Sequence, residues 1–108
     1  MSFENREKAN EAKFTMDQQK QFKIEARTSK LIGLWAAEQM HITGAEADAY
    51  AKSVVAANMD EPGFDDVRRK IVADFKEHHV EASDHLLETV FAKKLAEATA
   101  QIEAEAQA

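Results

Sequence analysis

The spacing of apolar residues predicts four amphipathic helices joined by short connections. Within each stretch an apolar residue recurs every three or four positions, which gathers the apolar side chains on one helical face. The first helix is predicted from Thr15 or Asp17 to Met40, and Glu61-Pro62-Gly63 separates the second helix from the third. The four predicted apolar faces are Phe22, Ile24, Leu31, Leu34, Trp35 and Met40; Ala47, Tyr50, Ala51, Val54 and Val55; Phe64, Val67, Ile71 and Phe75; and Leu87, Val90, Phe91, Leu95, Ala98 and Ile102.

Residues typical of helix N-termini mark where the later helices begin. The Thr43-Gly-Ala-Glu46 sequence has the form of a capping box, which predicts that it opens the second helix. The third helix is predicted to begin near Phe64 or Asp65, and the fourth is capped by Ser83 or Asp84. The last residues, AEATAQIEAEAQA, keep helix propensity but contain little apolar surface, so we expect them to fray.

The composition agrees with an all-α fold. One proline and three glycines interrupt the 108 residues, so little in the chain breaks a helix. Four helices with short links predict a compact four-helix bundle over residues 15–106. Residues 1–14 precede this domain as a mobile segment that is able to form a helix.

The first fourteen residues, MSFENREKANEAKF, are suited to a helix but offer little that could hold it against a core. On a helix Phe3 and Phe14 lie about 20° apart, with Arg6, Glu7 and Asn10 between them on the same side. Two apolar residues on a polar strip are fewer than an amphipathic helix needs. The segment is therefore either a frayed, solvated terminus or a helix that folds when a partner supplies the rest of the contact.

The charge is unevenly distributed and narrows the range of partners. Residues 1–30 contain seven basic and five acidic side chains, a net charge of +2, whereas residues 31–108 carry −8. An acidic body argues against binding to nucleic acid, which requires lysine and arginine opposite the phosphates. There is no cysteine, no apolar run approaches a membrane span, and the start lacks the apolar region of a signal peptide, so we expect a soluble intracellular protein.

The sequence contains no motif that indicates a catalytic site. Phosphate-binding glycine loops and the GxSxG motif do not occur. His78, His79 and His85 lie close together in the sequence, near acidic residues, but adjacent histidines point about 100° apart on a helix, which does not suit a metal site. We interpret them as part of a helix end, where a cationic side chain is favourable. No catalytic residue, metal ligand or cofactor is assigned.

A series of short motifs runs through residues 3–76. The motifs are Phe3-x-x-Arg6-Glu7-Lys8-Ala9, Glu11-x-Lys13-Phe14-x-x-Asp17, Phe22-Lys23, Glu25-Ala26-Arg27, Lys30-Leu31-x-Gly33-Leu34-Trp35-Ala36-Ala37-Glu38, Ala49-Tyr50-Ala51-Lys52-x-Val54-Val55, Glu61-Pro62-Gly63 and Asp66-Val67-x-Arg69-Lys70. Together they resemble the zeta subunit of the F-type ATP synthase of alphaproteobacteria, an all-α inhibitor of ATP hydrolysis. The fourth predicted helix matches this family in type and length.

The resemblance implies a mechanism for the N-terminal segment. In this family the segment enters the interface between the alpha and beta subunits near the gamma subunit, and a fourteen-residue helix is about 21 Å long. The resemblance also implies a cytoplasmic protein that is peripheral to the inner membrane through the ATP synthase head, a monomer when free, without direct membrane insertion. The residues that it assigns to the partner contact are Phe3, Arg6, Glu7, Lys8, Asn10, Lys13, Phe14 and Asp17.

Two stretches depart from the usual family pattern. The family commonly has Ala-Arg-Arg-Asn-Lys where this chain has Ala26-Arg27-Thr28-Ser29-Lys30, so any contact of the second arginine is lost or moved. Gln18-Gln19-Lys20 replaces a stretch that is usually more acidic. Both differences bear on the strength of inhibition.

Two other classes of function remain open from the residues alone. One is an acidic helical adaptor or regulatory protein for another partner. The other is a small bundle that binds a metal or ligand. Capture of the ATP synthase subunits from a lysate would separate the inhibitor from the adaptor, and metal analysis would test the second class.

Overall fold

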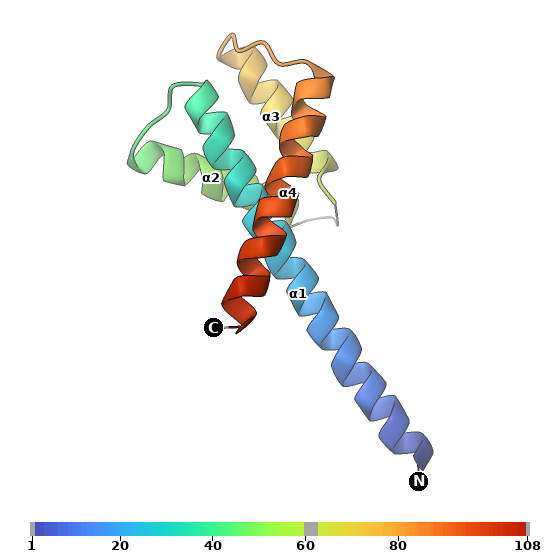
Figure 1. Ribbon diagram of the computed structural model, residues 1–108. Helices are drawn as coiled ribbons and strands as arrows, with labels where there is room; N and C mark the ends of the chain where they lie inside the picture. The colour runs from blue at the N-terminus through green and yellow to red at the C-terminus, as the bar shows by residue number, and fades with distance from the viewer. Residues whose placement is uncertain (1, 60–62, 108) are drawn as a thin grey trace.

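The structure is a computed structural model that describes the backbone of residues 2–59 and 63–107 and the side chains of residues 18–59 and 63–107 (Figure 1). It contains the helices α1 (Ser2–Gln39), α2 (Ala45–Asn58), α3 (Asp65–Glu77) and α4 (Asp84–Gln107). The predicted all-α fold of four helices is confirmed. The first helix extends back beyond its predicted start, as the absence of glycine and proline from residues 2–32 permits.

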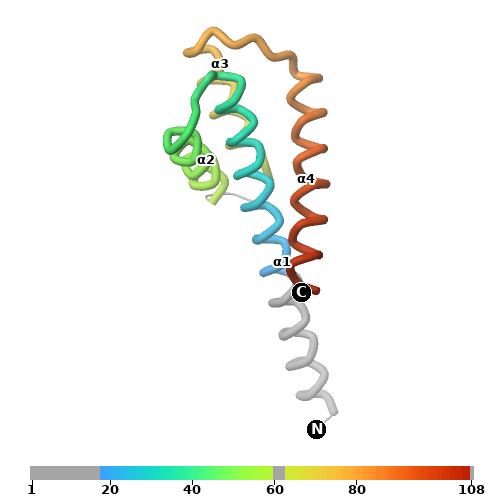
Figure 2. Tube along the Cα trace, turned by 60° about the vertical axis from the view of Figure 1, so that its left-hand side comes forward, coloured from blue at the N-terminus to red at the C-terminus, as the bar shows by residue number. Residues whose placement is uncertain are grey.

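The C-terminal half of α1 is the centre of the domain and contacts each of the other three helices. In Figures 1 and 2, α4 runs beside α1 in the opposite direction, and α2 crosses α1 on another side. The helix α3 contacts both α2 and α1. This arrangement places the C-terminal end of α4 beside residues 20–27 of α1.

The core lies where α1 meets the other three helices, and each helix contributes to it. Its buried residues are Ile32, Ala36, Met40, Val54, Val67, Ile71, Phe75 and Leu87. Partly buried rings extend it: the rings of Trp35 and Phe75 are 5.6 Å apart, and those of Phe64 and Phe91 are 6.5 Å apart, edge to face. Both are geometries that aromatic pairs prefer. The predicted faces of α3 and α4 are therefore confirmed, except that Leu95 is 38% exposed.

The buried face of α1 differs from the prediction. Phe22, which the pattern placed on this face, is 57% exposed, whereas Ile32, Ala36 and Ala37 are fully buried. Small residues dominate this face because the helices approach closely: a Cβ on Gly33 would lie 2.7 Å from Ala51 Cα. The contact between α1 and α2 thus depends on the absence of a side chain at position 33.

Thr28 and Ser29, which form part of one departure from the family pattern, are also fully buried. The Thr28 hydroxyl donates a hydrogen bond of 2.6 Å to the Ile24 carbonyl, while Ser29 Oγ has no partner among the described residues. An arginine at position 28 would place a charge where this chain has a small, satisfied hydroxyl, which is costly without a partner. The interior therefore accommodates Thr28 through its own hydrogen bond to the Ile24 carbonyl.

Two histidines end helices. His41 and His79 have φ values of 59° and 58°, in the left-handed region that histidine tolerates better than most residues. Ile42 N–H donates to the Ala37 carbonyl and Val80 N–H to the Phe75 carbonyl, each at 2.8 Å, so that both helices close in a Schellman motif. The interpretation of His78 and His79 as part of a helix end is confirmed.

The helix starts agree with the sequence at α4 but not at α2. Ser83 Oγ accepts a hydrogen bond of 3.1 Å from the Leu86 N–H, which is the predicted cap. The predicted capping box at Thr43 is wrong, because α2 begins at Ala45 and Gly44 occupies the N-cap without a side-chain hydrogen bond. Gly44 has φ 63°, a conformation that costs glycine least, so the connection enters the helix one residue later.

The expected fraying of the C-terminal residues is also wrong, since α4 continues to Gln107. Ile102 is only 8% exposed, and Glu105 pairs with Arg27 of α1. These long-range contacts hold a helical end that its own composition would not anchor.

Candidate functional site

The predicted inhibitory residues precede the side chains that the structure describes. The backbone of α1 includes their positions, but the side chains of Phe3, Arg6, Glu7, Lys8, Asn10, Lys13, Phe14 and Asp17 lie outside the described residues. The predicted mobility of residues 1–14 falls on the same segment and stays a prediction. The side chains that the structure describes therefore begin at Gln18, directly after the predicted inhibitory residues.

A groove of about 790 Å³ lies along this first described part of α1. Its walls come from α1, from the end of α2 and from the C-terminal turns of α4, so residues far apart in the sequence form it. The basic residues of its lining are Lys20, Lys23, Arg27 and Lys30, and the apolar ones are Phe22, Ala26, Val55, Ile102 and Ala106. Gln19 and the single carboxylate, Glu105, complete it.

Ionic contacts fix one wall of this groove. Arg27 donates from both terminal nitrogens to the Glu105 carboxylate, at 2.8 and 2.9 Å, and from Nη1 to Gln101 Oε1 at 2.8 Å. A second pair joins Lys20 to Glu103 at 3.6 Å. Because both pairs bridge α1 and α4, they hold the last turns of α4 beside the cationic part of α1.

The paired charges stabilise each other. The hydrogen bond and ion pair with Arg27 lower the pKa of the exposed Glu105 carboxyl, and Lys23 adds a smaller effect of the same sign. The same hydrogen bond raises the pKa of the Arg27 guanidinium. Both groups are therefore charged at neutral pH, and solvent screens most of the attraction between them.

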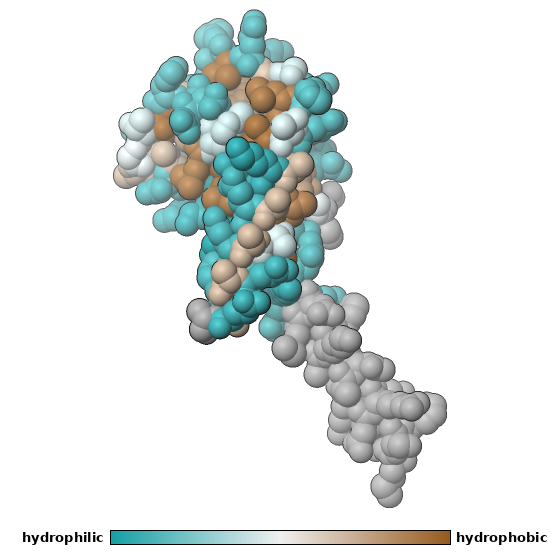
Figure 3. Space-filling model, viewed as in Figure 1, coloured by the Kyte–Doolittle hydropathy of each residue, from teal (hydrophilic) through white to brown (hydrophobic). Residues whose placement is uncertain are grey.

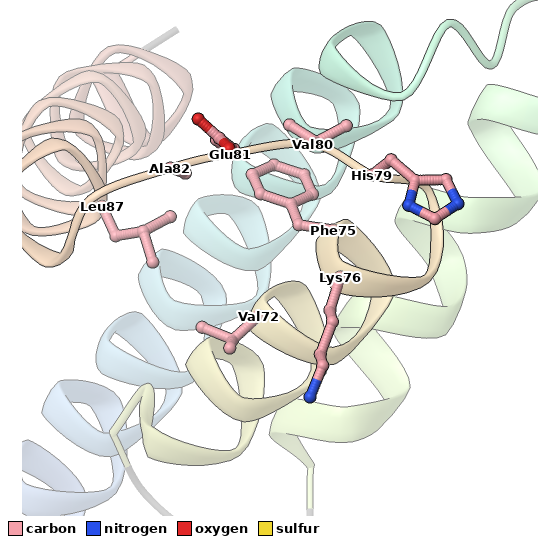
Figure 4. A pocket seen from close by; sticks show the side chains of 8 residues that line it. All are labelled: Val72, Phe75, Lys76, His79, Val80, Glu81, Ala82 and Leu87. Atoms are coloured by element: carbon pink, nitrogen blue, oxygen red, sulfur yellow. The ribbon is translucent and has the colours of Figure 1, made fainter.

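A smaller hollow of about 470 Å³ lies at the other end of the domain (Figure 4). Val72 and Phe75 point from α3 toward the connection to α4, and Leu87 closes the hollow from the first turns of α4. Lys76, His79 and Glu81 are its polar members, and His79 is the residue that ends α3. The hollow is the open edge of the core.

Another polar cluster joins α2 to α3. Tyr50 donates a hydrogen bond of 2.7 Å to Asp74, and Lys70 lies 3.1 Å from the same carboxylate and 5.2 Å from the centre of the Tyr50 ring. Partial burial, together with this hydrogen bond, raises the pKa of the Tyr50 hydroxyl. The neutral Tyr50 phenol donates to the Asp74 carboxylate and so links α2 to α3. Neither group is thereby activated as a base.

The histidines lie at helix ends and are not arranged as metal ligands. His78 Nδ1 lies 2.9 Å from the Asp74 carbonyl oxygen, and His85 is exposed in the first turn of α4. Within the described residues there is no group of three or more histidine and acidic side chains that could hold a metal ion.

Surface polarity separates the two ends of the domain. In Figure 3 the most hydrophobic residues gather over the end where α2, α3 and the start of α4 lie, and the rest of α4 shows a stripe of weakly hydrophobic residues flanked by hydrophilic ones. No helix in the described part of the chain is long and apolar enough to cross a bilayer. The groove that combines cations with an exposed ring, Phe22, lies at the hydrophilic end.

These features define an all-α protein with a groove that is lined by cations and an exposed aromatic ring. Residues 1–101 match the family model of the ATPase inhibitor subunit zeta, and the chain belongs to this family. Neither the curated proteins nor the solved structures contain a match.

The family match includes the N-terminal segment as well as the domain, which supports the role of an ATPase inhibitor.

The sequence interpretation missed the groove because it placed Phe22 in the core. The signal was available: residues two apart on a helix lie about 200° apart, so Phe22 is nearly opposite the buried Ile24.

Proposed function

We propose that this chain inhibits the F-type ATP synthase by inserting its N-terminal helix at an interface of the alpha, beta and gamma subunits in the catalytic head. The observation that carries the proposal is the family match, which extends over residues 1–101 and so includes the polar segment with its two phenylalanines. ATP hydrolysis requires that this interface open and close, and an inserted helix would prevent the movement.

The residue types in the segment suit this role. Phe3 and Phe14 would be the apolar anchors, because buried aromatic side chains often dominate an interface. Arg6, Lys8 and Lys13 would lie against acidic surface, and Glu7, Asn10 and Asp17 would complete the polar contacts. The segment is predicted to be mobile when free and to order on binding, at a cost of about 1–2 kcal/mol per residue.

The domain would hold this segment in place. The helix α1 runs from Ser2 to Gln39, so the inhibitory segment and the central helix of the core are one element. Because Ile32 and Ala36 anchor α1 in the core, the placement of the domain on the enzyme would determine where the N-terminal segment lies. The chain itself would carry no catalytic residue, cofactor or metal.

Addition of the purified chain to ATP synthase from the same source tests this function. Hydrolysis is expected to stop at saturating protein.

Replacing both Phe3 and Phe14 by alanine is expected to weaken inhibition strongly, since such anchors often contribute ~2 kcal/mol or more each. Lys8→Ala is the matched comparison: it should mainly slow association and change its salt dependence. Equal inhibition by the parent chain and the double variant would contradict the proposed anchors.

A further inference from the structure

The groove beside α1 is a concentration of positive charge on an acidic protein. Four cations line it, Lys20, Lys23, Arg27 and Lys30, against the one carboxylate of Glu105. The whole chain carries a net charge of −6. A surface of this kind is complementary to an acidic segment, and the remaining acidic surface of the chain would repel the same segment.

Two of these cations are available to a partner. Arg27 is already held by Glu105 and Gln101, and Lys20 is paired with Glu103. Lys23 and Lys30 are exposed and form no ion pair with the residues that the structure describes. Lys30 and Lys23 can therefore turn toward a new contact, although Lys23 also attracts the Glu105 carboxylate without forming an ion pair with it.

Phe22 gives the groove an apolar anchor. Its side chain is 57% exposed, although the ring is one of the largest apolar groups in the chain, and Val55 and Ile102 line the same groove. An aromatic residue with a charged rim is the usual composition of an interface centre. The groove therefore fits a segment that carries carboxylates and at least one apolar side chain.

The groove also continues the predicted inhibitory surface along α1. Gln18 follows Asp17 directly, and Phe22 is eight residues, or about 12 Å of helix, beyond Phe14. In the sequence, Arg6, Lys13, Lys20 and Arg27 are spaced by seven residues, and a helix brings such positions to nearly the same side. A partner that holds Arg6 and Lys13 would meet the groove next.

We propose that this groove binds an acidic segment on the surface of the ATP synthase head, with an apolar side chain of that segment against Phe22. The proposal rests on the proposed function, which supplies the partner. The groove increases the affinity for the head, whereas the N-terminal segment produces the block. Continuity with the inhibitory segment selects the head over a second copy of this chain as the occupant.

Two variants of the full chain test the groove: the double replacement Lys23→Glu and Lys30→Glu, and the single replacement Phe22→Ala. The measurement is a titration of ATP hydrolysis, which gives both the concentration for half-maximal inhibition and the residual activity at saturation. That concentration is expected to rise by about tenfold or more in each variant, because paired charges and aromatic anchors are lost. Saturating protein should still stop hydrolysis.

The matched control is Lys76→Glu with Lys93→Glu, which changes the net charge equally at exposed positions outside the groove. Circular dichroism verifies that all variants remain folded. If the groove variants titrate like the control while the parent chain inhibits, the groove proposal is wrong and the proposed function stands. If the parent chain neither binds nor inhibits the head, both proposals fail. A dimer of the parent chain that the lysine variant separates would assign the groove to a second copy and overturn the proposal.

Discussion

Deleting residues 1–14 is expected to abolish inhibition of ATP hydrolysis and to leave the four-helix domain folded. The deletion removes both phenylalanine anchors and the cations between them, whereas the buried apolar residues among those whose side chains the structure describes lie between Ile24 and Ile102. The melting temperature and helix content of the remaining domain, measured by circular dichroism, should therefore be close to those of the parent after correction for the lost residues. Hydrolysis by the ATP synthase in the presence of the truncated protein should match that of the enzyme alone.

Two results would contradict this expectation. Full inhibition by the truncated protein would place the inhibitory surface on the domain, and residues 1–14 would then be a solvated terminus. Unfolding of the truncated protein would show that the segment contributes to the core. The groove variants provide a useful comparison, because they should reduce affinity and keep complete inhibition at saturation.

Replacing Trp35 by alanine is expected to lower the free energy of unfolding by about 3–5 kcal/mol, the usual cost of truncating a large packed aromatic residue. Trp35 packs against the buried core and lies 5.6 Å from the Phe75 ring, so it joins α1 to α3. Denaturation by urea measures the change directly. A loss of this size is a large part of the stability of a domain of this length.

Phe22→Ala is the control for this measurement, because it removes an aromatic ring from the same helix at an exposed position. It should change the free energy of unfolding by no more than about 0.5 kcal/mol. An unchanged unfolding transition in the Trp35 variant would mean that the ring contributes little to the core, and a role in binding would then have to be considered.

Periodicity was sufficient to predict the four helices and most of their buried faces. The third and fourth helices begin as expected, at Asp65 and after the Ser83 cap, because local signals determine these starts. The errors occur where tertiary contacts override local preference. Ile102 and Glu105 hold the end of α4 against α1, and no property of the last residues alone predicts such contacts.

The buried face of α1 was harder to predict because hydropathy favours large residues. Gly33, Ala36 and Ala37 are buried because α2 and its neighbours approach the α1 backbone closely. A search for large apolar residues passes over such positions. It selected Phe22 instead, whose angle from Ile24 on the helix places it on the opposite side.

The candidate site was predictable only in part. The resemblance to a family supplied the inhibitory residues, and the match over residues 1–101 supports that family. The groove could not be predicted, because it combines α1 with Val55 of α2 and Ile102 of α4. Residues this distant in the sequence come together only in the folded domain.

Cross-linking from position 14 tests most directly whether the N-terminal helix inserts at the catalytic interface of the ATP synthase. A photoreactive phenylalanine analogue replaces Phe14, the inhibited complex is irradiated, and mass spectrometry identifies the attached peptide. The same analogue at the exposed Ala92 of α4 is the control for chance contacts. We predict that position 14 attaches to the alpha, beta or gamma subunit at their interface, in proportion to the inhibition reached. A chain that inhibits fully but whose position 14 attaches to none of these subunits would contradict the account.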